Sequence, residues 1–264
     1  MTRRRIAMMA LLPAILMISL SACAPGGPPT DGPTKTAQLV IDTTFDIKTI
    51  DPGREYEPTG QILVKALYDT LLTFADNDTT KIIPDLATFT ANDAWTEFTF
   101  VLEPGRKFSD NSLVTADDVV FSLQRLAGMN GVPAFLLEGM TITKVDDKTI
   151  KVTTEDSAPA LPAIMTTPSA GILNSKVVIA NGGTTNKNDA AEAYLNSHSA
   201  GSGPYILETL DVASQAVLVK NPAYNGPQKP TYDKIVLRNV EPVAVESLRI
   251  IFRDMVLRRF HDIA

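Results

Sequence analysis

Residue types that could carry out hydrolysis are scarce in this chain of 264 residues. The two histidines are His198 and His261. Ser202 lies near His198 in the sequence, but it is not part of the G-x-S-x-G turn that exposes a nucleophilic serine. A serine nucleophile also needs a base within hydrogen-bond reach and a group that orients this base. We therefore expect no catalytic residues.

The acidic residues have structural explanations. Asp117-Asp118 follow Thr115 in the form of a capping box at the start of a helix, and Asp146-Asp147 fit a turn between two strands. No cluster of His, Cys and acidic side chains has the spacing of metal ligands. The sequence therefore predicts no metal site and no cofactor.

Cys23 is the one cysteine, and its surroundings indicate a covalent chemistry. Arginines at 3–5 precede an apolar run over 6–20, which has the length of a secretory signal and is short for a membrane span. The sequence Leu20-Ser21-Ala22-Cys23 then resembles a bacterial lipobox, in which the cysteine thiol receives a diacylglyceryl group. A buried free cysteine is the common alternative, but the Pro/Gly-rich stretch that follows offers no core. We predict a lipoprotein signal peptide at 1–22, lipidation of Cys23 and a flexible tether at 23–36.

The net charge excludes some classes of partner. The formal charge of −6 would become −9 after cleavage before Cys23, because three arginines and no acid are lost. Nucleic acids and anionic membrane surfaces are bound through basic patches. We therefore expect no nucleic-acid partner, and contact with a membrane through the lipid alone. A single cysteine also excludes an internal disulfide.

The segment 84–126 has the most ordered local pattern. Phe98, Phe100 and Leu102 alternate with polar residues, which is typical of a half-buried strand. Turns are expected at 103–105 and 109–112 because they contain Pro, Gly, Asp and Asn. Thr115 should then cap a helix that extends to about Leu126, with an apolar face at every third or fourth residue.

The rest of the chain mixes strands and helices. We expect strands at 38–42 and 234–238, and hairpins at 141–154 and 205–220. In the first hairpin, Ile142 and Val145 should face Ile150 and Val152. Helical spacing covers 60–72, and the Gly/Thr/Asn-rich stretch 181–188 is expected to be a surface loop. The fold class is therefore α/β, of the mixed α+β kind.

This order of elements resembles bacterial extracellular solute-binding proteins of family 5, the peptide, dipeptide and nickel type that serves ABC importers. Their usual pattern is LRxGVKFxDGxPLTAxDVVFSLxR. The matching residues are Leu102, Gly105, Lys107, Phe108, Asp110, Thr115, Ala116, Asp118, Val119, Val120, Phe121, Ser122, Leu123 and Arg125. The departures are Glu103, Arg106, Asn111, Leu113 and Val114, which we interpret as loop variation.

Four shorter motifs extend the resemblance over about 38–240. Ile50-Asp51-Pro52 is similar to the family's LDP, and 67–72 is similar to its xYExLL. Further on, 201–205 is similar to GTGPY and 220–224 to xNPxY. The resemblance implies that 37–240 forms the first lobe of a two-lobe fold like that of periplasmic binding proteins. The family carries a second lobe after this point, so we interpret 241–264 as a helix at the aberrant end of a truncated chain.

The resemblance also suggests where a ligand would bind. Thr43, Thr44 and Phe45 follow the first strand, where the family has a ligand-facing loop, although an ordinary strand exit explains them equally well. Tyr68 and Trp95 could line an aromatic wall, and we favour a core position for Tyr68. The glycine and proline of 203–205 are expected to meet demands of the backbone and not to contact a ligand.

The function implied by the resemblance is that of a substrate-binding lipoprotein of an ABC importer. It would bind peptides or similar small solutes outside the cytoplasmic membrane, in the cell envelope, and deliver them to permease subunits without being an enzyme. One alternative is a truncated remnant or interaction module that no longer binds ligand. A surface lipoprotein hydrolase is the other, and it would need the catalytic set that we do not find.

Overall fold

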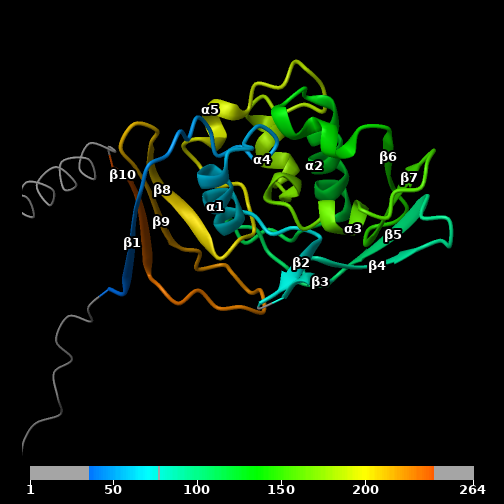
Figure 1. Ribbon diagram of the computed structural model, residues 1–264, viewed down its shortest axis with the longest axis horizontal. Coiled ribbons are helices and arrows are strands. Elements are labelled where there is room, and N and C mark those ends of the chain that lie inside the picture. Colours follow the sequence, from blue (N-terminus) through cyan, green and yellow to red (C-terminus); the bar gives the residue numbers. More distant parts are fainter. Residues whose placement is uncertain (1–35, 77, 241–264) are drawn as a thin grey trace, which may run out of the picture. The chain divides into compact units, whose positions relative to one another are not determined.

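The computed structural model describes residues 36–76 and 78–240, and within them the strands form three sheets (Figure 1). The strands are β1 (Gln38–Thr43), β2 (Leu72–Ala75), β3 (Asp78–Pro84), β4 (Ala87–Ala91), β5 (Glu97–Leu102), β6 (Met140–Lys144), β7 (Thr149–Thr154), β8 (Tyr205–Asp211), β9 (Gln215–Lys220) and β10 (Lys234–Asn239). The α-helices are α1 (Pro58–Leu67), α2 (Ala116–Gly128), α3 (Leu161–Ile164), α4 (Ser175–Ala180) and α5 (Glu192–Leu195), and the 3₁₀ helices are η1 (Val132–Leu137) and η2 (Pro168–Ala170). The expected mixed fold class is confirmed.

The first sheet joins the two ends of the described chain. Its strand order is β1-β10-β9-β8, and β1 runs parallel to β10, with Gln38 opposite Lys234 and Thr43 opposite Asn239. The hairpin β8–β9 is antiparallel, as expected. Side chains of this sheet and of α1 share one buried cluster, in which Leu63 and Leu237 are 1 % exposed.

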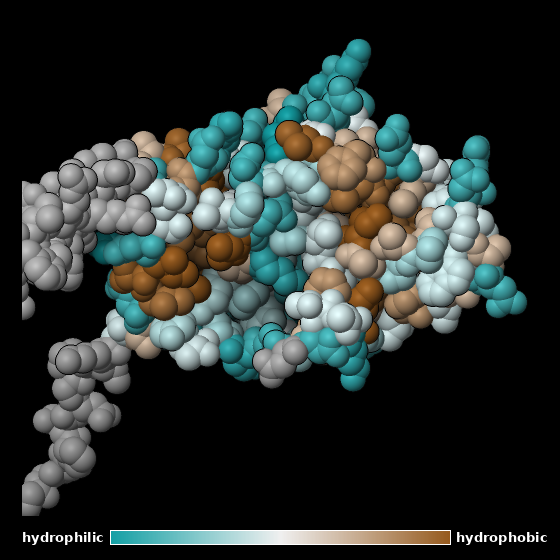
Figure 2. Space-filling model, in the orientation of Figure 1, coloured by the Kyte–Doolittle hydropathy of each residue, from teal (hydrophilic) through white to brown (hydrophobic). Residues whose placement is uncertain are grey.

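The second sheet consists of β2 and β3 alone, and the third sheet has its own core. Its strand order is β4-β5-β7-β6, entirely antiparallel. Phe98 and Phe100 of β5 are fully buried, and Leu102 is 7 % exposed, so the expected alternation is confirmed. They pack in a second buried cluster with α2, which contributes Val119 and Leu123. Figure 2 shows apolar surface in separate areas, over the first sheet and near α2 and α3, with hydrophilic surface between them.

The helix α2 begins at the predicted capping box. The Asp118 backbone N–H donates to Thr115 Oγ1 at 3.4 Å, and the Thr115 N–H donates to Asp118 Oδ2 at 3.0 Å. Asp118 also accepts from the Ser175 N–H at 2.9 Å through its other oxygen, which ties α4 to this end of α2. Just before it, Asn111 has φ of 69°, the left-handed conformation that a glycine would supply at this place in the family pattern.

Two expectations about local structure are wrong. The helical spacing over 60–72 overshoots, because α1 ends at Leu67 and Leu72 begins β2. The last carbonyl is used by another segment, since the Gly203 N–H donates to Leu67 O at 3.0 Å. In the hairpin β6–β7, Ile142 does face Val152, but Lys144 and not Val145 pairs with Ile150. Val145 lies in the turn and is 57 % exposed.

The domain interpretation is only partly covered by the structure. The segment 37–240 holds both clusters, and the stretch 181–188 is without helix or strand, as expected of a loop. The predicted signal peptide, Cys23, nearly all of the tether and the C-terminal helix at 241–264 lie outside the described residues. Within the described ranges, no helix is both long and apolar enough to cross a membrane.

Candidate functional site

The predicted ligand loop lies at the carboxyl end of β1. Thr43 and Phe45 are half-buried, and Thr44 is exposed. Because β1 and β10 are parallel neighbours, their carboxyl ends lie at the same edge of the sheet. In sheets with parallel strands, ligands commonly bind outside this edge. The position is therefore suitable for a ligand, although no cavity described in the structure is lined by these three residues.

Asn239 fixes the position of this loop. Its side-chain oxygen accepts from the Phe45 N–H at 3.2 Å, and its side-chain nitrogen donates to Ala213 O in the β8–β9 turn at 3.2 Å. The Val240 N–H donates to Thr43 O at 3.0 Å. These bonds use the Thr43 carbonyl and the Phe45 N–H and hold the loop at the end of the sheet. No local pattern marks Asn239, because its partners Phe45 and Ala213 are distant in the chain.

A second constellation is centred on the buried Arg125 of α2. Its guanidinium donates to both oxygens of Asp51, at 2.7 and 2.6 Å, and to both oxygens of Asp189, at 2.8 Å each. The side chains of Arg125, Asp51 and Asp189 are 1 %, 0 % and 0 % exposed. Arg54 also contacts Asp189, at 2.9 Å. This group, the Arg125 cluster, has two arginines and two aspartates and is electrically balanced.

The contacts of the Arg125 cluster indicate that it stabilises the fold and does not bind a ligand. Burial by itself raises the pKa of Asp189, but hydrogen bonds from Arg125 and from the Thr184 N–H outweigh it, so this pKa is below its usual value. Arg125 is paired with both aspartates, and Arg54 pairs with Asp51 and Asp189 and lies 3.8 Å from the half-exposed Glu192. The cluster joins the loop before α1, the helix α2 and the segment before α5, and it leaves no charge free for a ligand.

A third constellation contains Arg106, which corrects our interpretation of this residue as loop variation. Arg106 is 7 % exposed. It donates to Asp69 Oδ2 at 2.6 Å and to Asp85 Oδ1 at 3.2 Å. Asp69 follows α1 and Asp85 follows β3, so Arg106 connects the turn after β5 to both. We call these three residues the Arg106 cluster, and it has one more negative than positive charge.

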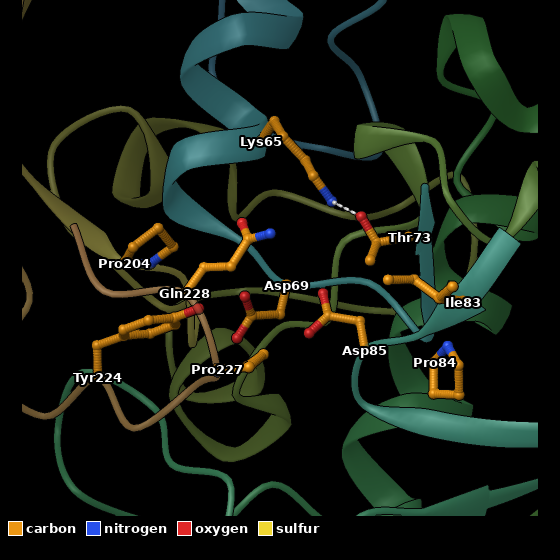
Figure 3. A pocket seen from close by; sticks show the side chains of 10 residues that line it. All are labelled: Lys65, Asp69, Thr73, Ile83, Pro84, Asp85, Pro204, Tyr224, Pro227 and Gln228. Carbon is orange, nitrogen blue, oxygen red and sulfur yellow. Dashed lines mark hydrogen bonds between the residues drawn. The ribbon is translucent and has the colours of Figure 1, made fainter. Parts of the chain in front are cut away.

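The Arg106 cluster borders a cavity of about 230 Å³. The cavity is lined by Lys65, Asp69, Thr73, Ile83, Pro84, Asp85, Pro204, Tyr224, Pro227 and Gln228. Figure 3 shows the carboxylate of Asp85 turned towards Asp69 and that of Asp69 turned towards the Tyr224 ring. The ammonium of Lys65 points away from both, to Thr73 Oγ1 at 3.4 Å.

The electrostatics of the Arg106 cluster differ from those of the Arg125 cluster. Burial raises the pKa of Asp69 to about 6, and repulsion by Asp85 adds to this, while Arg106 opposes it. Burial also raises the pKa of Tyr224 to about 12, with a contribution from Asp69. One guanidinium is thus insufficient to keep the pKa of Asp69 at its usual value. The Arg106 cluster holds a charge that lacks a full partner.

The remaining residues that the sequence suggested, Tyr68, Trp95 and Gly203, do not form a ligand site in the part of the chain that the structure describes. Tyr68 is 1 % exposed, as predicted for a core residue, whereas Trp95 is 38 % exposed in the β4–β5 turn with φ of 55°. Gly203 is structural, as predicted, because a Cβ there would lie 2.5 Å from the backbone of Leu67. Neither aromatic residue lines a cavity described in the structure.

The structure does not assemble His198 and Ser202 into a catalytic pair. His198 is exposed, and its Nδ1 lies 2.9 Å from Ser197 Oγ. Ser202 is 1 % exposed, and its hydroxyl has no hydrogen-bond partner among the described residues. Within 36–76 and 78–240, no group of three or more His, Cys, Asp or Glu side chains is placed to hold a metal ion.

Known proteins resemble this chain in sequence. Residues 81–249 match the family described as bacterial extracellular solute-binding proteins, family 5 Middle. The probable D,D-dipeptide-binding periplasmic protein DdpA of Escherichia coli K12 is 30 % identical over 219 residues, which are 80 % of this chain and 41 % of the relative. Glutathione-binding protein GsiB of Escherichia coli O157:H7 is 25 % identical over 222 residues, which are 80 % of this chain and 39 % of that protein.

Solved structures share the fold. The binding protein MoaA of A. tumefaciens R10, in complex with mannopinic acid, aligns with a TM-score of 0.69 and 25 % identity over 83 % of this chain and 44 % of that one. The substrate-binding domain of an oligopeptide ABC transporter from Bacillus anthracis aligns with a TM-score of 0.66 and 23 % identity, over 83 % and 45 %. The chain spans less than half the length of these relatives. The profile match covers more than half of the chain, and we conclude that it belongs to the bacterial extracellular solute-binding proteins of family 5.

Proposed function

We propose that this chain contributes to binding peptides or similar small solutes for an ABC importer and that it is not an enzyme. The observation that carries the proposal is the edge formed by the parallel strands β1 and β10, where Asn239 holds the loop of Thr43, Thr44 and Phe45. Family membership supports this class of function. Peptides are favoured because DdpA, GsiB and the oligopeptide transporter are named for dipeptide, glutathione and oligopeptide ligands.

The loop offers suitable groups for such a ligand. Thr43 and Thr44 supply hydroxyls that can donate or accept hydrogen bonds, and the half-buried ring of Phe45 can cover an apolar side chain. A ligand at this edge would face the loop on one side. Binding proteins of two lobes close around the ligand and remove water from it. We therefore expect the 264-residue chain to bind peptides weakly, with a Kd near 1 mM, which corresponds to about −4.1 kcal/mol.

Calorimetry with a library of di- to pentapeptides tests this proposal. Asn239→Ala should weaken binding about tenfold, because it releases the loop that contains Phe45. Asn188→Ala is the matched control, since Asn188 is exposed and its side chain makes no hydrogen bond within the described residues. Equal binding by Asn239→Ala and the wild type would place the ligand elsewhere. Failure of every peptide to bind would favour the alternative of a remnant or interaction module.

We also propose that the chain is anchored in the cell envelope, outside the cytoplasmic membrane, by a lipid on Cys23. The support is the run from Arg3 to Ala22, with its basic start, apolar middle and lipobox-like end. Mass spectrometry of the membrane fraction should detect a diacylglyceryl adduct on Cys23 at the amino terminus of the mature protein. Cys23→Ser should release the protein or stop its processing. A mature form that begins at another residue would contradict the proposal.

A further inference from the structure

The Arg106 cluster, which borders the cavity, has an unbalanced buried charge. Asp69 and Asp85 have side chains that are 6 % and 11 % exposed, and the single guanidinium of Arg106 lies between them. Two buried carboxylates with one buried cation leave one negative charge over. Burial of a charge without a partner is unfavourable, so this site should acquire a proton or a cation.

The carboxylates present free acceptors to the cavity. Arg106 bonds Oδ2 of Asp69 and Oδ1 of Asp85, and the other oxygen of each accepts no hydrogen bond from a described residue. Both residues line the cavity, and Figure 3 shows the Asp85 carboxylate turned towards Asp69 and the Asp69 carboxylate turned towards the Tyr224 ring. Ser202, two residues before the cavity-lining Pro204, is also buried, and its Oγ has no hydrogen-bond partner among the described residues. Each aspartate therefore offers one free carboxylate oxygen at the cavity.

The walls of the cavity specify an organic cation. Pro204, Pro227, Ile83 and the Tyr224 ring enclose the carboxylates with apolar surface. The face of this ring already attracts cations, since Arg106 lies 5.9 Å and Lys229 5.8 Å from its centre. Metal ions prefer more oxygen ligands than two carboxylates supply. A volume of about 230 Å³ is also below the roughly 300–1,000 Å³ of sites for drug-sized ligands.

We propose that this cavity is a binding site for a small primary alkylammonium ion. The ammonium donates to the free oxygens of Asp69 and Asp85, and its short alkyl chain lies against the prolines and Tyr224. This site is separate from the loop of Thr43, Thr44 and Phe45, and the proposal does not depend on peptide binding there.

Lys65 lines the cavity and, like Lys229 over the Tyr224 ring, is a cation of the described chain that could compete for this site. Its ammonium lines the same cavity but lies 3.3 Å from Thr70 Oγ1 and 3.4 Å from Thr73 Oγ1, and it forms no ion pair with either carboxylate. Replacing it with methionine keeps the length of the side chain and removes the charge. Lys65→Met should therefore bind an added amine at least as tightly as the wild type.

Titration calorimetry of the 264-residue chain with n-butylammonium chloride at pH 7.5 and fixed ionic strength tests the proposal. We expect saturable binding of one equivalent, which Asp69→Asn and Asp85→Asn each weaken tenfold or more. Asp42→Asn is the matched control, because Asp42 is an exposed aspartate paired with Arg238, and it should change the affinity less than twofold. Tyr224→Leu should weaken binding about threefold or more, and it serves as a second variant if an aspartate variant does not fold.

Neutral and inorganic probes separate the other outcomes. n-Butanol should not bind, and equal binding of butanol would show an apolar hollow without charge recognition. Competition by NaCl as strong as that by the amine would show a site for any monovalent cation and would overturn the proposal. A dipeptide that displaces butylammonium, while its N-acetylated form does not, would identify the amino terminus of a peptide as the occupant. Absence of saturable amine binding in both the wild type and Lys65→Met would also overturn it.

Discussion

Two buried arginines organise this chain in different ways. Arg125 is enclosed by Asp51, Asp189 and Arg54, and the charges of its cluster cancel. Arg106 has two aspartates and no second arginine within its cluster, and a cavity opens beside it. Both arginines link segments that are far apart in the sequence. The two clusters differ in net charge: the Arg125 cluster is neutral, and the Arg106 cluster has one negative charge in excess.

This difference in net charge distinguishes a cluster that stabilises the fold from a cluster that could bind a ligand. A balanced, solvent-free cluster adds specificity to the fold but has no unused acceptor. An unbalanced cluster beside a cavity keeps an acceptor available, and the raised pKa of Asp69 is the sign of it. In this chain, the net charge of a buried ionic cluster and its access to a cavity therefore indicate whether the cluster could bind a ligand.

The largest effect is expected from Arg125→Met. It leaves Asp51 and Asp189 buried with only Arg54 as a partner, and loss of one member of a buried ion pair costs about 3–5 kcal/mol. Urea unfolding followed by circular dichroism measures this loss. Arg238→Met is the matched control, because Arg238 makes the same two-bond contact with Asp42 at 2.7 and 2.8 Å but is 51 % exposed. An exposed pair contributes only about 0–1 kcal/mol, so equal losses would refute the comparison.

Arg106→Met should destabilise the protein by less, about 2–3 kcal/mol at pH 7. The loss is limited because Asp69 can take up a proton and because water can reach the carboxylates through the cavity. Adding Asp69→Asn to this variant should recover part of the stability in the same urea experiment, since one unpaired charge is removed. A double variant less stable than Arg106→Met would show that Asp69 is not the source of the penalty.

The pH dependence of Asp69 sharpens the comparison further. Its pKa is about 6 in the folded protein, against an ordinary value of 3.8, so the folded state binds this proton more tightly. The contribution of the group to stability is therefore fully present below about pH 4 and is lost as the pH rises through about 6. The stability of the wild type relative to Asp69→Asn should fall by about 2 kcal/mol between pH 4 and pH 7.

Urea midpoints of both chains at several pH values give this difference. Using the difference between the two chains cancels the contributions of other carboxylates, such as Asp189, whose lowered pKa acts in the opposite direction. A difference that does not vary with pH would mean that Asp69 titrates normally in the folded protein.

The smallest effect is expected from Thr115→Ala, at roughly 0.5–2 kcal/mol and typically about 1. Thr115 precedes the helix that carries Arg125, and it accepts from the Asp118 N–H. The urea midpoint of the variant measures the change, with Thr141→Ala on the exposed face of β6 as control. An unchanged midpoint would mean that the hydrogen bond from Asp118 N–H to Thr115 does not stabilise α2, the helix that carries Arg125.

Local patterns explain which parts of the fold were predictable. The burial of Phe98 and Phe100 follows from alternation within one strand, and the cap at Thr115 depends on a residue three positions away. The end of α1 was missed because Gly203 binds the carbonyl of Leu67 from 136 positions later in the chain. The short helices α4 and α5 were missed because six and four residues are too few for a clear periodic pattern.

The candidate site was harder to predict from the sequence, because its residues come together through contacts between distant segments. Thr43, Thr44 and Phe45 were located through a family resemblance, but Asn239 belongs to them only through the pairing of β1 with β10. The partners of Arg106 lie 37 and 21 residues away. An arginine where the family pattern has valine was the available signal, because a buried position that changes from apolar to charged requires new partners.

The parallel pairing of β1 with β10 has a consequence for the order of folding. Asp42 and Arg238 face each other across 196 positions of the chain, so β1 leaves the ribosome long before its neighbour exists. At roughly 5–20 residues per second, this delay is about 10–40 s. The antiparallel hairpins β6–β7 and β8–β9 need no such wait. The first of the described strands to be made is thus among the last to gain its neighbour, and the first sheet is completed only when the end of the described chain is available.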